Sequence, residues 1–63
     1  MRRWQRISRE PAVVGRLYEG RFGDALGTWE DEGPFFLHDD GCWYRVDPPA
    51  QLVNIPIWVR ETE

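Results

Sequence analysis

The residues best suited to chemistry stand together in one short segment, His38-Asp39-Asp40-Gly41-Cys42, which holds the only histidine and the only cysteine of the chain. If His38 and Cys42 faced each other across a hairpin, an imidazolium would favour a reactive thiolate. Asp-Asp-Gly is also what a tight turn requires without any chemistry, because aspartate suits the turn positions and glycine accepts a positive φ. A small cysteine next to a tryptophan on a strand is typical of packing. The segment therefore indicates a turn, and we assign no catalytic residue.

Carboxylates are the other concentrated chemical group. Six of them occur between residues 22 and 44 with no lysine or arginine among them, namely Asp24, Glu30, Asp31, Glu32, Asp39 and Asp40. The alternating ligands of a calcium loop, closed by a glutamate at its twelfth position, are missing. One cysteine and one histidine cannot complete a four-ligand zinc site. The G-x-S-x-G, Walker and G-x-G-x-x-G patterns are missing too. We therefore expect a protein that is not an enzyme and that uses no metal or cofactor.

The charge of the chain is strongly uneven along its length. Residues 1–21 carry six arginines against two glutamates, whereas residues 22–44 carry only the six acids, within a net charge of −3. Such an acidic stretch resembles electrostatically the phosphate backbone that a basic groove binds. The six carboxylates are therefore the predicted partner-binding residues, and a basic surface that reads nucleic acid is the predicted partner.

Two alternatives to this interpretation stay open. The carboxylates would also serve only to keep a tryptophan-rich miniature domain in solution. Direct nucleic-acid binding is the second alternative, since arginines at positions 2, 3, 6 and 9 lie beside Trp4, a pattern compatible with phosphate contacts and base stacking. The acidic half of the chain would repel the same phosphate backbone.

The elements that must position these residues are short. Trp4 and Ile7 share one face of a possible helix from Met1 to Arg9, which would have to dock in order to persist. β-Branched and aromatic residues predict strands over Ala12 to Tyr18 and Ala25 to Trp29, joined through the glycine-bearing segment 19–24.

The second half of the chain predicts one hairpin and one edge strand. Segment 30–34, Glu-Asp-Glu-Gly-Pro, has the composition of a turn. Segment 35–46 predicts a hairpin with a turn over Asp39 and Asp40 and with His38 opposite Cys42. Pro48 and Pro49 take the chain out of the sheet. Because Pro56 has no amide proton to donate, a last strand from Ile55 to Arg60 is expected at a sheet edge.

Sixty-three residues allow one domain, 1–63, with four tryptophans to build its core. The predicted fold class is α+β or mainly β, with a small antiparallel sheet of four to five strands and a short N-terminal helix. Trp43 lies in the middle of a strand of the best-defined hairpin, so it is the tryptophan that we expect to be most buried. A lone cysteine and the lack of a long apolar run predict a cytoplasmic protein.

Two resemblances add to this interpretation. The opening W-Q-R-I-S-R-E-P, with Trp4, Ile7, Ser8 and Pro11, and the closing I-P-I-W resemble short phage and prophage proteins of unknown function that begin W-x-x-I-S-x-x-x-P and end in a tryptophan-containing strand. The chain lacks the T-H-W and P-L-P of that family, which brings no catalytic residues.

The second resemblance is one of class. A tiny acidic protein without enzyme signatures is similar to the inhibitors that phages carry against host defence, including anti-CRISPR proteins, several of which mimic DNA. This likeness implies an inhibitor in the host cytoplasm whose partner is a protein or ribonucleoprotein with a basic surface, a CRISPR effector being the most concrete candidate. The alternative is a phage accessory or structural module that binds another protein.

Overall fold

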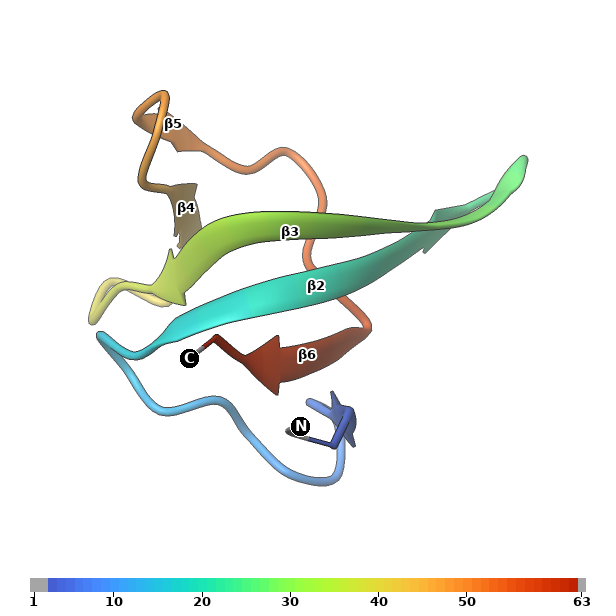
Figure 1. Ribbon diagram of the computed structural model, residues 1–63, viewed down its shortest axis with the longest axis horizontal. Helices are drawn as coiled ribbons and strands as arrows, with labels where there is room; N and C mark the ends of the chain where they lie inside the picture. The colour runs from blue at the N-terminus through green and yellow to red at the C-terminus, as the bar shows by residue number, and fades with distance from the viewer. Residues whose placement is uncertain (1–2, 63) are drawn as a thin grey trace.

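The computed structural model describes residues 3–62, and within them the chain forms one antiparallel sheet of six strands and no helix (Figure 1). The strand order across the sheet is β1-β6-β2-β3-β4-β5. The strands are β1 (Gln5–Arg6), β2 (Leu17–Asp24), β3 (Gly27–Leu37), β4 (Trp43–Arg45), β5 (Ala50–Gln51) and β6 (Trp58–Glu61). No helix in this part of the chain is long and apolar enough to cross a membrane. The fold is thus mainly β, which is one of the two fold classes predicted from the sequence.

The long hairpin of β2 and β3 forms the centre of the sheet. Its strands meet at a two-residue turn, because Asp24 pairs with Gly27. The predicted strand over Ala12 to Tyr18 is wrong for most of its length, and segment 19–24, predicted as a connection, lies inside β2. This position of β2 requires glycine, because a Cβ there would lie 3.0 Å from the Phe22 ring and 3.2 Å from Pro56. Close packing, and not a turn, requires this glycine.

Segment 30–34 was predicted as a turn, yet it continues β3 through a bulge. Tyr18 pairs with Phe35 and Gly20 with Asp31, so β3 uses two more residues than β2 over this interval. Gly33 takes a φ of +76°, which only glycine adopts at little cost. Its N–H donates to Asp31 Oδ1 at 3.1 Å. The extra residues are accommodated inside the strand, so the chain does not leave the sheet here.

The hairpin of β3 and β4 confirms the prediction over residues 35–46. Leu37 pairs with Trp43, and the His38 N–H donates to the Cys42 carbonyl at 2.9 Å. Gly41 has a φ of +85°, and its N–H donates to the His38 carbonyl at 3.0 Å. After the turn at residues 46–49 the chain returns for the short strand β5, which pairs with β4.

The predicted N-terminal helix is wrong within the described residues, and positions 1 and 2 of it lie outside them. Gln5 pairs with Val59 and Arg6 with Trp58, so this segment adds a strand beside β6. A turn follows, in which the N–H groups of Arg9 and Glu10 donate to the Arg6 carbonyl. A nine-residue helix has little stability of its own, and pairing with the exposed edge of β6 satisfies the same backbone groups.

β6 lies inside the sheet, between β1 and β2, so its prediction as an edge strand is also wrong. Pro56 precedes the strand and is fully buried, and therefore its missing N–H removes no hydrogen bond from the ladder. The prediction of four to five strands fell short because β1 and β5 have two residues each, too few to show an alternating pattern.

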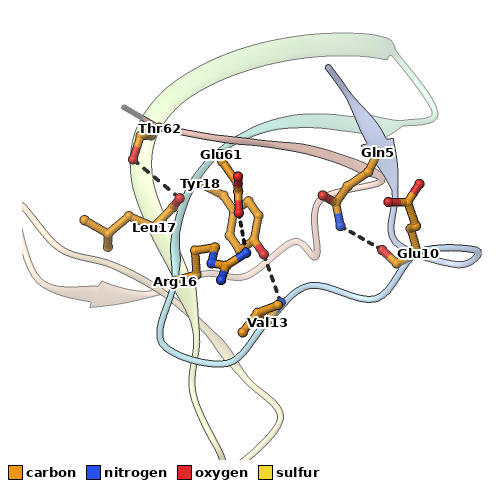
Figure 2. Close-up of polar contacts among 8 residues, drawn as sticks. All are labelled: Gln5, Glu10, Val13, Arg16, Leu17, Tyr18, Glu61 and Thr62. Carbon is orange, nitrogen blue, oxygen red and sulfur yellow. Dashed lines mark hydrogen bonds and ion pairs between the residues drawn. The ribbon is translucent and has the colours of Figure 1, made fainter. Parts of the chain in front are cut away.

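One face of the sheet carries the core, which consists of Tyr18, Phe22, Phe35, Trp43 and Val59. Trp43 is 5% exposed and is the most buried tryptophan, as predicted. The segment between β1 and β2 packs on this core through Ala12 and is held by the Tyr18 hydroxyl, which accepts a hydrogen bond from the Val13 N–H at 2.9 Å (Figure 2). Neighbours on a strand alternate between faces, so the opposite face of the sheet, here called the open face, carries the pairs Glu19 with Arg60 and Arg21 with Trp58.

Candidate acidic interaction surface

The six predicted site residues do not gather in one cluster. Asp24 lies at the tip of the β2–β3 hairpin, Glu30, Asp31 and Glu32 lie in β3, and Asp39 and Asp40 form the β3–β4 turn. The tip and the turn lie at opposite ends of β3 (Figure 1). Because neighbours on a strand alternate between faces, Glu30 lies on the open face and Asp31 on the core face. The set is therefore spread along one strand and its two ends.

Glu30 and Asp31 are held in ion pairs across strands. The Arg21 Nε donates to Glu30 Oε1 at 2.7 Å, and the Arg45 Nη2 donates to Asp31 Oδ2 at 2.8 Å. The hydrogen bond from Arg45, with a further one from the Gly33 N–H, holds the pKa of Asp31 below its ordinary value against the opposing effect of burial. These two carboxylates already have internal cationic partners.

The β3–β4 turn holds its aspartates through local hydrogen bonds. Asp40 Oδ1 accepts from the Cys42 N–H at 2.8 Å and Oδ2 accepts from the Tyr44 hydroxyl at 2.7 Å. These bonds lower the pKa of Asp40, and the bond to Asp40 raises the pKa of Tyr44. Hydrogen bonding to the charged form of a carboxylate stabilises that form. Asp40 is therefore a fixed negative charge at the surface.

His38 stands opposite Cys42, but its ring turns toward the acids. Its Nδ1 lies 2.8 Å from Asp39 Oδ1 and 3.3 Å from the backbone nitrogen of Asp40. The ring also contacts Tyr44, with centroids 5.6 Å apart. The Nδ1 atom of His38 therefore contacts the Asp39 carboxylate and the Asp40 backbone, and not the Cys42 thiol. Within residues 3–62 no three histidine, cysteine, aspartate or glutamate side chains come together as ligands for a metal ion.

Internal ion pairs account for five of the arginines in the described chain. The pairs are Arg3–Glu10, Arg16–Glu61, Arg21–Glu30, Arg45–Asp31 and Arg60–Glu19. The Arg16–Glu61 pair joins the segment before β2 to β6 (Figure 2). Each of these pairs cancels one positive charge against one negative charge of the sequence.

The charges that remain are separated in space. The carboxylates that form no ion pair with an arginine of the described residues are Asp24, Glu32, Asp39, Asp40 and Asp47. All of them lie between the β2–β3 tip and the β4–β5 turn. The arginines without a carboxylate partner there are Arg6 and Arg9, in β1 and the turn that follows it. We name the five carboxylates the acidic set. The surplus negative charge thus lies between the end of β2 and the β4–β5 turn, and the surplus positive charge lies at the β1 edge.

Sequence reasoning missed the arginine and tryptophan contacts of the open face. Arg21 and Arg60 lie over the Trp4 ring at 4.1 and 4.5 Å from its centroid, and Arg6 lies 5.5 Å from the Trp58 centroid. Cation–π contacts of this kind fix the N-terminal segment on the sheet. The alternation of Trp58 with Arg60 in the sequence was the available signal. Of the arginines considered for nucleic-acid contact, Arg3 pairs with Glu10 and Arg6 lies over the Trp58 ring, while position 2 lies outside the described residues.

Comparison of the chain with protein-family models, curated proteins and solved structures found no match.

Proposed function

We propose that this protein is a small non-enzymatic inhibitor, of the kind that phages and mobile elements carry, which binds a basic nucleic-acid-binding surface of a host defence complex as a DNA mimic. The partner is a protein or ribonucleoprotein, with a CRISPR effector as the most concrete candidate. One observation carries the proposal. After the five ion pairs are formed, the surplus carboxylates lie along β3, at the turns at its two ends and in the β4–β5 turn, whereas the surplus arginines lie in β1 and the turn after it.

The ion pairs of the structure determine which of the predicted site residues can contribute charge to partner binding. Asp24, Glu32, Asp39 and Asp40 form no ion pair with an arginine of the described residues and are the primary candidates. Glu30 and Asp31 contribute less, because an arginine lies within 2.8 Å of each and cancels most of their field at a distance. Asp47, in the β4–β5 turn, joins the primary set.

Rigid presentation supports the same proposal. Asp24 Oδ1 accepts the Leu26 N–H at 2.8 Å, and Asp40 bonds to the Cys42 N–H and to the Tyr44 hydroxyl. Carboxylates held in this way have little freedom left to lose when a partner binds. A fixed spacing of charges is what a groove built for a phosphate backbone recognises.

The test begins with a pull-down of the tagged protein from a host lysate and continues with duplex DNA as competitor against the captured complex. Exposed charge pairing is screened over about 8–10 Å at ordinary ionic strength, so we expect capture to weaken steeply as salt rises and to be displaced by DNA. A variant with Glu32→Gln, Asp39→Asn and Asp47→Asn should lose capture. A matched triple variant at paired carboxylates, Glu10→Gln, Glu30→Gln and Glu61→Gln, should retain most of it. Failure of DNA to compete would overturn the proposal.

A second function, an accessory module that binds another protein through apolar contacts, is favoured by one observation. Val53 and Ile55, in the segment between β5 and β6, are 97% and 65% exposed, and Leu26 at the β2–β3 tip is 96% exposed. Apolar contacts weaken little with salt. Capture that survives high salt and is lost in a Val53→Ser, Ile55→Ser variant would favour this function over the DNA mimic.

A further inference from the structure

Within residues 3–62, no strand pairs with the outer edge of β3 between Gly27 and Asp31. β4 pairs with Phe35–Leu37 only, and the β2–β3 hairpin extends beyond both of its neighbours (Figure 1). An unpaired edge presents a row of N–H and C=O groups on which another chain can add a strand. This edge is not part of the acidic set described above.

The hydrogen bonds of β2 determine which backbone groups of β3 point outward. The Leu17 carbonyl accepts from the Thr62 N–H at 3.2 Å, and the Arg21 carbonyl accepts from the Ile57 N–H at 2.8 Å. The odd-numbered residues of β2 therefore direct their backbone groups toward β6. Since these groups alternate along a strand, the even-numbered residues of β2 direct theirs toward β3.

The same alternation continues on β3. Phe22 is even-numbered and pairs with Trp29, so Trp29 bonds inward to β2. Thr28 and Glu30 flank it, and their N–H and C=O groups point away from β2. Among the described residues no backbone group bonds to them from that side. Two residues thus offer two donors and two acceptors at the spacing of a strand ladder.

The side chains along this edge define what fits beside it. Glu30 lies on the open face with 63% of its side chain exposed, and Glu32 follows it on the same face, where it interacts electrostatically with Arg60. On the other face Trp29 is 40% exposed and stacks on Phe22 with centroids 5.8 Å apart. A shallow hollow at this place is lined by Arg21, Thr28, Trp29 and Glu30.

We propose that this edge binds an extended peptide segment of a partner protein in which arginine or lysine alternates with apolar residues. The backbone of that segment bonds to Thr28 and Glu30 as an added strand. Its cationic side chains lie beside Glu30 and Glu32 on the open face, and its apolar side chains lie beside Trp29 on the other. Opposite charges in neighbouring positions stabilise a strand pair, as do apolar side chains beside an aromatic ring.

A second copy of this chain does not suit the edge. Antiparallel self-pairing in the registers that bring Glu30 opposite Glu30 or Glu32 of the other copy would set like charges across the strands, which destabilises the pair. The inference does not rest on the proposed DNA mimicry, because its hydrogen bonds come from the backbone of β3; Glu32 is the one residue of the acidic set that both proposals use.

The test uses the isotope-labelled full chain and an acetylated, amidated peptide of three Arg-Val repeats. In the free protein we expect the amide protons of Thr28 and Glu30 to exchange rapidly with solvent and that of Trp29 slowly. At about 90% occupancy by the peptide, exchange at Thr28 and Glu30 should slow about tenfold. The same peptide with N-methyl groups on the residues facing β3 has equal charge and should give no protection. Equal binding by the methylated peptide, or no protection by the parent peptide, would overturn the proposal.

A variant separates strand addition from charge attraction. Thr28→Pro removes an outward N–H and leaves the bonds between β2 and β3 in place, which an edge position tolerates. It should abolish peptide binding, whereas Thr28→Ala should bind as the parent does. Both variants keep every carboxylate, so capture of a DNA-competed partner should be unchanged in them. A dimer in sedimentation that Thr28→Pro dissolves would show that a second copy occupies the edge, contrary to the proposal.

Discussion

Trp43 shows at the level of a single residue why so short a chain can hold a core. It is 5% exposed and meets the Tyr18 ring edge-on at 6.0 Å. Removing a buried aromatic ring costs the transfer free energy of its atoms and leaves a cavity, about 3–5 kcal/mol together. We expect Trp43→Ala to lose that much stability in a urea melt. Trp29→Ala should lose clearly less, because Trp29 is 40% exposed; equal losses would mean that Trp43 is not central to the core.

Asp31 makes stability depend on pH through its pair with Arg45. Its pKa is lowered in the folded protein, first by the hydrogen bond from Arg45. A depressed folded pKa stabilises the fold above the ordinary aspartate pKa of 3.8, and that contribution is lost as the pH falls through the folded value.

We therefore expect Asp31→Asn to be less stable than the parent at pH 7 in thermal melts and to approach the parent as the pH falls below the ordinary aspartate pKa of 3.8. The variant keeps Asp40, whose pKa is also lowered, so that the difference between the two proteins isolates Asp31. A gap that stays constant down to pH 2 would show that the charge of Asp31 adds nothing to stability.

At the level of elements, the bulge at Gly33 determines how β3 reaches β4. A Cβ at this position would lie 2.7 Å from the Phe35 backbone nitrogen and 3.0 Å from the Tyr18 carbonyl oxygen, and the φ is +76°. Backbone strain of this kind costs about 1–3 kcal/mol, before the clash is counted.

Gly33→Ala should therefore be less stable than the parent in a urea melt by at least about 1–3 kcal/mol. Gly41→Ala is the matched control. Gly41 has a φ of +85°, but nothing lies within 4 Å of a Cβ there. If the two variants lost the same stability, the close packing inside the bulge would be irrelevant.

The elements also show which parts of the fold the sequence can predict. The β3–β4 hairpin was predictable because Asp39, Asp40 and Gly41 contain the whole turn within a few residues. The N-terminal segment was not, since Arg6 pairs with Trp58, a partner 52 positions away that local periodicity does not report. Glycines in β2 looked like turn residues because some of their close neighbours are distant in sequence, Pro56 at Gly20 and Ile57 at Gly23.

The candidate site also has one part that the sequence predicts and another that it does not. The position of each carboxylate follows from the sequence, but its partner follows from strand register. Arg45 reaches Asp31 across 14 positions, and Arg21 reaches Glu30 only because β2 and β3 pair as they do. Sequence charge alone therefore overstated the free charge of Glu30 and Asp31.

At the level of the whole molecule, charge at the strand edges should determine whether the protein stays a monomer. β1 and β5, the outermost strands, have two residues each, too few to pair strongly with another copy. The outer edge of β3 is longer, and Glu30 and Glu32 protect it, since charged side chains discourage edge-to-edge pairing.

We expect Glu30→Thr with Glu32→Thr to associate in sedimentation velocity at concentrations where the parent is a monomer. The change replaces like-charge repulsion with threonine pairs worth about 0.2–1 kcal/mol per cross-strand contact. Asp39→Asn with Asp47→Asn lowers the net charge by the same amount away from the edge, so it should remain monomeric. Association of both double variants would point to net charge in general. Association of neither would mean that the twist of the hairpin, and not these two glutamates, keeps the edge from pairing with itself.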